Sequence, residues 1–271
     1  MSTNYICTTC GNQFAATDSP PDVCPICRDE RQYVNPKGQS WTAVAELRKG
    51  HHNYFKAQES GLIGIATYPS VAIGQRALLL QTPNGNILWD CTPLLDDITV
   101  KTVEALGGIA AIAVSHPHLA STLVEWSHAF NNAPIYWHVA DKDWVMRPDA
   151  NFVFWEGKTA QPLEGITLIN CGGHFPGSSV LHWSDGAAGK GVLLTGDTIM
   201  VIPDKRYVTF MYSYPNQIPL SGAAVEQIVG AVEPYSYDRI YGGWFDAVIS
   251  EGAKEAVNRS AERYLKAISG E

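Results

Sequence analysis

Short apolar runs alternate with polar and turn-forming residues along most of the chain, a pattern that predicts β-strands. The expected strands are residues 62–68, 71–74, 77–82, 87–91, 109–114, 135–139, 152–155, 166–170, 178–183, 191–197 and 239–242. Asn84-Gly85 lies between two of these runs and predicts a β-hairpin, and Asp185-Gly186 marks a second one. Most of the chain is therefore expected to form β-sheets.

Other segments follow the helical period of 3.6 residues. Helices are expected at residues 41–49, capped by Ser40 and ended by Gly50, and at 99–106, 119–130 and 223–232. In a final helix the apolar residues form a stripe that packs on a sheet: Ala253, Ala256, Val257, Ala261, Tyr264, Leu265 and Ile268. Two β-rich halves, each followed by helices, predict an α/β (α+β) fold with two sheets face to face and helices outside.

Composition narrows the classes of function. The chain has 271 residues, 45% of them hydrophobic and 17% charged, as in soluble globular proteins. A net charge of −8 without runs of Lys or Arg excludes a general nucleic-acid-binding surface. No apolar stretch approaches the roughly 20 residues that cross a bilayer, and residues 1–10 lack the apolar core of a signal peptide. We therefore expect a cytoplasmic protein without nucleic-acid or membrane partners.

The N-terminal 36 residues contain two CxxC pairs separated by a polar loop: Cys7, Cys10, Cys24 and Cys27. In a reducing compartment such pairs are metal ligands more often than disulfides. Four thiolates complete a tetrahedral site, and metal binding supplies much of the folding free energy of so short a segment. Cys91 and Cys171 each end an apolar run and are expected to be small core residues.

Residues 5–33 resemble a zinc ribbon and also the rubredoxin-like module of rubrerythrins, with its CxxCG and CPxC pattern. Either resemblance implies a metal site with four cysteine ligands, and four cysteines suit zinc or iron. We favour zinc, because nothing else in the chain indicates electron transfer, and keep iron as the alternative. The module is expected to be structural or to bind a protein partner. The expected domains are this module at 1–36, a linker with a short helix at 37–60, and a main domain at 61–271.

Two histidines follow the apolar run 109–114, at the point where a strand ends and a helix begins. A strand end fixes the direction of His116 and His118, and neutral imidazole is a common metal ligand. His174 leaves a strand among glycines that give the backbone room beside an ion, in the sequence CGGHFPGS. Asp197 ends the buried run LLTGD, where a carboxylate is costly unless it is paired or binds metal.

These motifs, in this order, resemble the metallo-β-lactamase superfamily, whose pattern is HxHxDH, GHTPGS, GD and a last histidine. The resemblance covers residues 60–271, with ILWDC at 87–91 matching the family's first aspartate strand. It implies an αββα sandwich. The chain departs from the pattern at the residues that would complete a second metal site: Ala120, Ser121 and Trp244 stand where the family has Asp, His and His. Phe175 also replaces a threonine.

The resemblance therefore implies a mononuclear site with one zinc, or iron, held by His116, His118 and His174. Asp197 is expected to be a fourth ligand or a base that orients water. By the same analogy the aromatic-rich loop after Asp197 lies over the metal, and four of its residues are candidates for substrate binding: Arg206, Tyr207, Tyr212 and Tyr214. His128, His138 and His182 are expected in the core or on the surface.

Three functions stay open at this point. The first is a metal-dependent hydrolase of a small ester-, thioester- or lactone-type molecule. The second is an iron enzyme that resembles the persulfide dioxygenases of the same superfamily, with His116, His174 and Asp197 as the triad. The third is a non-catalytic metalloprotein whose four-cysteine module binds a partner. Nucleases are disfavoured, because residues 197–244 are too few for their extra domain.

Overall fold

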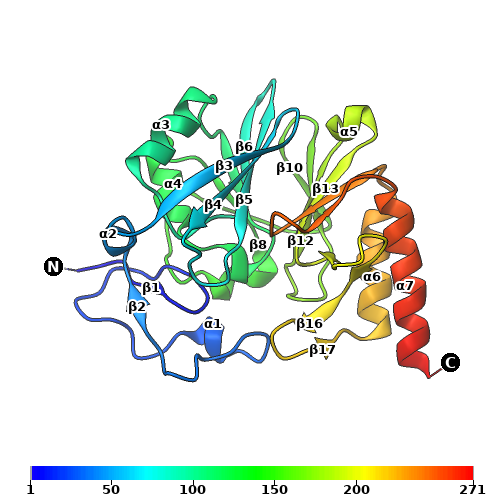
Figure 1. The fold of residues 1–271 in the computed structure, drawn as a ribbon, viewed down its shortest axis with the longest axis horizontal. Coiled ribbons are helices and arrows are strands. Elements are labelled where there is room, and N and C mark those ends of the chain that lie inside the picture. The colour runs from blue at the N-terminus through cyan, green and yellow to red at the C-terminus, as the bar shows by residue number, and fades with distance from the viewer. Residues whose placement is uncertain (1, 271) are drawn as a thin grey trace.

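A computed structural model describes residues 2–270 and contains two stacked β-sheets with helices on their outer faces (Figure 1). One sheet has seven strands in the order β3-β4-β5-β6-β7-β8-β9. Their bounds are β3 (His52–Glu59), β4 (Leu62–Tyr68), β5 (Arg76–Thr82), β6 (Gly85–Trp89), β7 (Ala111–Ala113), β8 (Ile135–His138) and β9 (Phe152–Trp155). The pairs up to β5-β6 are antiparallel and the pairs from β6-β7 onward are parallel.

The other sheet has six strands in the order β10-β11-β12-β13-β18-β19. They are β10 (Thr159–Leu163), β11 (Ile166–Asn170), β12 (Ser179–Trp183), β13 (Val192–Gly196), β18 (Arg239–Gly242) and β19 (Val248–Ile249). All pairs are antiparallel except β13-β18. The segment between β13 and β18 carries two small hairpins: β14 (Met200–Val201) with β15 (Val208–Thr209), and β16 (Met211–Ser213) with β17 (Ile218–Pro219).

Alternate side chains of each strand pack on opposite sides of its sheet, because successive side chains point to opposite faces. Leu78 and Leu80 of β5 face inward and pack in one cluster with Leu181 and Leu194 of the other sheet. Leu79, between them, faces outward to a second cluster that includes side chains of the helices. The two predicted sheets therefore lie face to face with a shared core, which confirms the expected sandwich.

Helices cover both outer faces (Figure 1). On the seven-stranded sheet these are α3 (Asp97–Ala105) and α4 (Leu123–Ala129), and on the six-stranded sheet α6 (Gly222–Val232) and α7 (Ala253–Ser269). The carboxylate of Asp96 caps α3 by accepting from the Thr99 amide at 2.7 Å, and the Ser221 hydroxyl caps α6. The predicted stripe of α7 is buried from Ala253 to Ala261, whereas Ile268 is exposed.

Most of the predicted elements form close to the expected bounds. Both predicted hairpins are present, β5-β6 and β12-β13; the latter connection carries the short helix α5 (Gly186–Gly189). The helix expected at 119–130 is shorter: a 3₁₀ turn, η1 (Pro117–Leu119), comes first, and α4 begins only at Leu123. Ser121 separates the two because its φ of +51° lies in the left-handed region, which a right-handed helix cannot include.

The four-cysteine module lies beside one end of the sandwich (Figure 1). It consists of a small sheet of β1 (Ile6–Cys7) and β2 (Trp41–Thr42) and the one-turn helix α1 (Pro25–Arg28). Its four cysteines form a cluster with Phe14 and Ile26, against which Trp144 and Met146 of the main domain pack. Trp144 ends the 3₁₀ helix η2 (Val139–Trp144) between β8 and β9. The module is thus packed directly on the sandwich.

The segment expected to be a linker with a helix at 41–49 differs from that expectation. Trp41 and Thr42 are extended and pair with the first cysteine strand, so the helix α2 spans only Val44–Leu47. Residues 52–59 form β3, which pairs with β4 along its length. The sheet therefore begins at His52, before the predicted boundary at residue 61. β3 is an edge strand with a half-exposed polar face, a weak pattern that did not indicate a strand.

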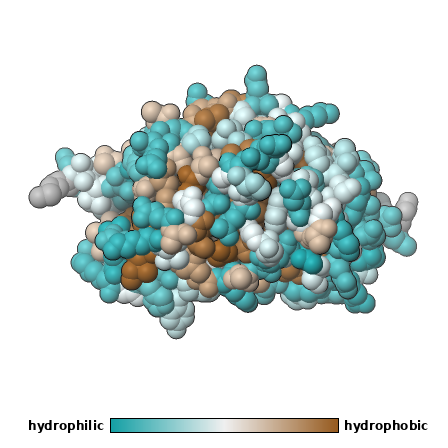
Figure 2. All heavy atoms as spheres, turned by 90° about the horizontal axis from the view of Figure 1, so that it is seen from above, coloured by the Kyte–Doolittle hydropathy of each residue, from teal (hydrophilic) through white to brown (hydrophobic). Residues whose placement is uncertain are grey.

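Hydrophilic side chains cover most of the face seen in Figure 2, with hydrophobic side chains between them. The apolar side chains of the two sheets lie in the buried clusters described above. None of the helices within residues 2–270 combines the length and the hydrophobicity that a membrane-crossing helix requires.

Candidate metal centres

His116 and His118 lie directly after β7, at one end of the sandwich. The backbone before them is held by Asp90, whose Oδ1 accepts a hydrogen bond from the Ser115 amide at 2.8 Å. The Ser115 hydroxyl lies 3.0 Å from Nδ1 of His116, which leaves Nε2 free to face the site. Burial raises the pKa of Asp90 to about 8. The carboxyl at the end of the aspartate strand thus holds the histidine loop, and it is not among the candidate ligands that converge.

His174 reaches the same point from the loop between β11 and β12. Its Nδ1 lies 2.8 Å from the backbone carbonyl oxygen of Tyr212, an acceptor that requires the proton on Nδ1. This hydrogen bond fixes the tautomer and leaves Nε2 as the ligand atom. His174 Nε2 then lies 3.2 Å from Nδ1 of His118. Neighbouring glycines supply the bend here, since Gly172 and Gly173 both have positive φ angles.

Asp197 directly follows β13 in the six-stranded sheet, opposite the sheet that carries His116 and His118. Its Oδ1 lies 3.2 Å from Nε2 of His116 and 4.0 Å from Nε2 of His174. The hydroxyl of Tyr214 donates a hydrogen bond to the Asp197 carbonyl at 2.6 Å and so fixes the backbone at this position. Both sheets and the loop after β13 therefore contribute to one site.

The site is enclosed, and its electrostatics follow from that. The three histidines and Asp197 are each at most 6% exposed. Burial lowers the pKa values of His116 and His118 well below the ordinary value, which favours the neutral imidazoles that bind metals. Burial also raises the pKa of Asp197. A nearby cation would reverse this effect, because it stabilises the carboxylate.

Two buried polar atoms at this point lack a hydrogen-bond partner among residues 2–270: Nε2 of His116 and Oδ1 of Asp197. Such atoms are rare in folded proteins, because leaving them unpaired costs about 1–3 kcal/mol each. The candidate ligand atoms of the three histidines lie within 4.8 Å of one another. The residues present therefore fit one metal ion with nitrogen and carboxylate ligands.

The three residues that replace second-site ligands have other partners. The hydroxyl of Ser121 donates a hydrogen bond to the Gly11 carbonyl of the cysteine module at 3.1 Å. Ala120 is buried in the core beside α4, and the Trp244 indole donates to the Ile73 carbonyl at 3.1 Å. None of these side chains offers a ligand, and the module occupies the space next to Ser121.

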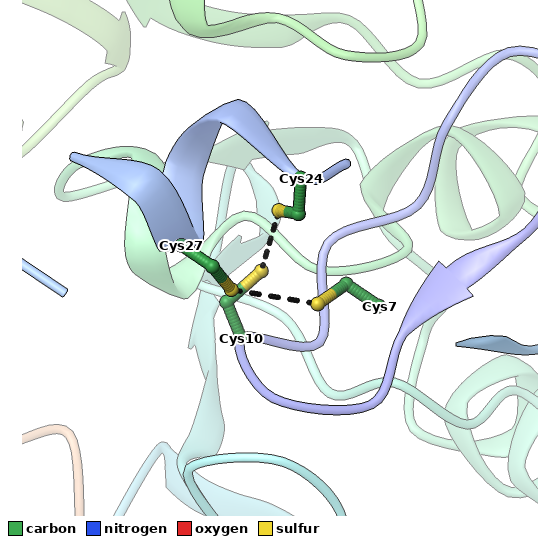
Figure 3. A group of neighbouring side chains, drawn as sticks. All are labelled: Cys7, Cys10, Cys24 and Cys27. Atoms are coloured by element: carbon green, nitrogen blue, oxygen red, sulfur yellow. Dashed lines mark hydrogen bonds between the residues drawn. The ribbon is translucent and has the colours of Figure 1, made fainter. Parts of the chain in front are cut away.

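The four cysteines form the second candidate metal centre (Figure 3). Their Sγ atoms lie 3.5 Å apart between Cys7 and Cys27 and 3.6 Å apart between Cys10 and Cys24, so all are free thiols and not disulfides. The side-chain amide of Gln39 donates to the sulfur of Cys7 at 3.1 Å. Hydrogen bonds from the other three thiols lower the pKa of Cys7, whereas its neighbours and burial raise that of Cys10. Four converging sulfurs suit a tetrahedral ion.

The proposed substrate-binding residues separate into two pairs. Tyr212 and Tyr214 lie at the histidine site through the hydrogen bonds described above. Arg206 is exposed and paired with Asp204 at 2.7 Å, and its backbone carbonyl accepts from Arg259 of α7 at 2.6 Å. The guanidinium carbon of Arg263, also of α7, lies 3.7 Å from the centre of the Tyr207 ring. The contacts of this second pair thus place it against α7.

Sequence reasoning missed Arg31, which belongs to the cysteine module. Its Nη1 donates to the backbone carbonyl of His174 at 3.2 Å, and its guanidinium carbon lies 3.8 Å from the centre of the Phe175 ring. The two segments are 143 residues apart in the chain, and no motif connects them.

The other three histidines considered in the sequence form hydrogen bonds away from this site. His128 bonds to Asp149, His138 to the Gly157 carbonyl and His182 to the Ser236 carbonyl.

Comparison with known proteins places the chain in a family. No family model matches the sequence. The chain is 51% identical over 269 residues to the uncharacterized protein YmaE of Bacillus subtilis (strain 168), a match that covers 98% of this chain and 97% of YmaE. The chain belongs to the YmaE family. The match extends over both parts of the chain, the cysteine module and the sandwich.

Solved structures show the fold of this YmaE-family chain. VMB-1 matches 80% of this chain and 98% of its own length with a TM-score of 0.60 at 13% identity. DIM-1 metallo-β-lactamase matches 78% and 98% with a TM-score of 0.57 at 13% identity. A Cronobacter sakazakii metallo-β-lactamase with a HARLDQ motif matches 80% and 93% with a TM-score of 0.50 at 17% identity. The resemblance seen in the motifs is confirmed: the chain has the metallo-β-lactamase fold.

Proposed function

We propose that the protein is a mononuclear metal-dependent hydrolase that acts on a small ester-, thioester- or lactone-type substrate in the cytoplasm. One observation carries the proposal: His116, His118 and His174 converge, and the Asp197 carboxylate lies 3.2 Å from the nearest of their ring nitrogens. Three neutral imidazoles with a further open position are the ligand set of many catalytic zinc sites. We propose one zinc ion here and a second, structural one at the four cysteines.

When bound at the histidines, a metal ion polarises a carbonyl group and lowers the pKa of a water molecule toward 7. Asp197 would accept a proton from that water or orient it, because its Oδ1 faces the same point as the ring nitrogens. Tyr214 keeps the backbone of Asp197 in place, and Tyr212 does the same for the His174 ring. These two residues would position the groups that act on the substrate.

Burial of the site supports a small substrate. The ligands are enclosed by the loop after β13 and by Arg31 and Phe175, so a bulky polymer would not reach them. The module uses one of its faces to pack on the main domain, and its other face would remain for a protein partner.

A substrate screen tests the proposal. Zinc-loaded protein is assayed with small esters, thioesters and lactones beside His116→Ala and Asp197→Asn, and metal content is measured for each. We expect turnover by the wild type, loss of one metal equivalent and of turnover in His116→Ala, and lower turnover in Asp197→Asn. If wild type and His116→Ala are equally inactive although the wild type holds two metals, the protein is a metalloprotein without hydrolase activity.

A second candidate rests on the geometry of Asp197. Its Oδ1 faces His116 at 3.2 Å and His174 at 4.0 Å, as two histidines and one carboxylate would in a non-haem iron oxygenase. Iron in the protein as purified, together with oxygen consumption on thiol or persulfide substrates, would favour this function. Zinc at the histidines without oxygen consumption would favour the hydrolase.

A further inference from the structure

Residues 29–32 connect the two candidate metal centres. This segment begins two residues after Cys27 and lies on the loop of residues 211–219, which forms the hairpin β16-β17 (Figure 1). The Asn216 amide donates to the backbone carbonyls of Glu30 and Gln32, both at 2.9 Å. Ser213, which is fully buried, donates to the carbonyl of the residue between them at 3.1 Å. Three successive carbonyls of the module are therefore held by two side chains of the loop.

The same loop holds two of the four histidine-site groups. The backbone carbonyl of Tyr212 accepts the Nδ1 proton of His174, and the hydroxyl of Tyr214 donates to the backbone of Asp197. The phenol of Tyr212 also donates to the Glu30 carboxylate at 2.7 Å. Residues 212–216 thus contact the cysteine module on one side and the histidine site on the other.

Arg31 adds a direct contact. Its guanidinium pairs with Asp29 at 2.6 Å, lies against the Phe175 ring and donates to the His174 carbonyl. Phe175 in turn packs on the rings of His116 and His118. The module therefore fixes both the backbone and the surroundings of the ring that must face the ion.

We propose that residues 29–32 and 212–216 are positioning residues through which metal at the four cysteines raises the affinity of the histidine site for its own metal. The proposal rests on metal binding at the histidines, which the proposed function also requires. Without metal, so short a module lacks the core to stay folded. Segment 29–32 then loses its anchor two residues away at Cys27, and the loop that orients His174 and Asp197 loses its partner.

The coupling is a linkage and therefore acts in both directions. If metal at the cysteines raises the affinity at the histidines by some factor, metal at the histidines raises the affinity at the cysteines by the same factor. Partners that orient a metal-binding histidine typically contribute about 10–100-fold to metal affinity. The contacts of the loop are indirect, so we expect an effect of about 10-fold, at the lower end of that range.

Cobalt(II) titration of the full chain tests the proposal, because only cobalt at the cysteines gives thiolate-to-metal charge-transfer absorption. Zinc is first bound at the cysteines, and cobalt affinity at the histidines is then measured for wild type and Ser213→Ala/Asn216→Ala. These substitutions leave all ligands in place. Asp204→Asn is the control, a half-exposed polar residue of the same connection whose side chain pairs with Arg206. We expect about 10-fold weaker cobalt binding in the double variant and no change in the control.

A second comparison uses Cys27→Ser, which removes one ligand of the four-cysteine site. It should weaken cobalt binding at the histidines as the double variant does, and combining the two should cause no further loss, because both act through segment 29–32. Wild-type affinity in the loop variant overturns the coupling even if Cys27→Ser unfolds the module. If the wild type binds no cobalt at the histidines, the proposed function and the coupling both fail. If cobalt binds at the histidines with the same affinity in the wild type, the loop variant and Cys27→Ser, only the coupling fails.

Discussion

The hydroxyl of Ser121 donates a hydrogen bond to the backbone carbonyl of Gly11 at 3.1 Å, and the Ser121 carbonyl accepts from the Gln13 amide at 3.2 Å. Ser121 stands where the metallo-β-lactamase pattern has a second-metal histidine. In this chain the position binds the cysteine module instead. The residue that replaces a second-site ligand is thus also a residue that holds the cysteine module on the sandwich.

We predict that Ser121→His does not restore a second metal. The Oγ atom of Ser121 is 3.6 Å from the point where a Cβ on Gly11 would lie, so an imidazole would meet the module, and Ala120 and Trp244 still offer no ligand. Elemental analysis should show no gain in metal per chain, and unfolding should require less urea. Ser121→Ala is the control and should cost about 1 kcal/mol for the lost hydrogen bond. A third metal equivalent in Ser121→His would contradict this account.

Asp141→Asn should change how stability depends on pH. Asp141 is buried and accepts from the Gly177 amide at 2.8 Å, and burial raises its pKa from 3.8 to about 6. Between these values the folded state binds more protons than the unfolded state, so stability falls as pH rises from about 4 to 6. Asparagine keeps the acceptor and removes this loss.

Urea unfolding of both proteins from about pH 5 to about pH 7 measures the effect. The advantage of the Asn variant should grow by about 1 kcal/mol over this range and then level off. Parallel stability curves would show that the carboxyl titrates alike in the folded and unfolded states.

Removal of the cysteine-bound metal should unfold the module and leave the sandwich folded. Besides its four cysteines the module buries Ile6, Phe14 and Ile26, too little apolar surface to offset the entropy of ordering it. Limited proteolysis after chelation should cut between Cys10 and Cys24 and leave a fragment that contains residues 52–270. Cys10→Ser should be cut in the same place without chelator. Equal resistance of the metal-free and metal-loaded chains would contradict this prediction.

The sequence predicted the sandwich well because its core strands carry strong local signals. Runs such as residues 77–82 are apolar, bounded by turn residues and joined by recognisable hairpins. The histidine motifs were recognised because each lies within a few residues of chain. β3 was missed because an edge strand with alternating exposure has no apolar run. Arg31 was missed because its role depends on a contact with His174, 143 residues away, which no local pattern encodes.

Arg31→Lys should destabilise the protein although it keeps the charge. Arg31 is largely buried, pairs with Asp29 through two nitrogens and lies over the Phe175 ring, and lysine reproduces neither the paired geometry nor the planar group over the ring. We expect a loss of about 1–3 kcal/mol, the range for hydrogen bonds to charged groups together with a desolvated cation–π contact.

The chain contains a matched control for this prediction. Arg206 makes the same two-nitrogen pair with Asp204, also two residues earlier, but this pair is exposed to solvent. Exposed ion pairs contribute little, so Arg206→Lys should leave the urea midpoint unchanged. Urea unfolding of both variants separates the effect of the pair from the effect of its surroundings. Equal losses of stability at the two positions would mean that the ion pair alone, and not the contact of Arg31 with Phe175 and His174, accounts for the effect of Arg31→Lys.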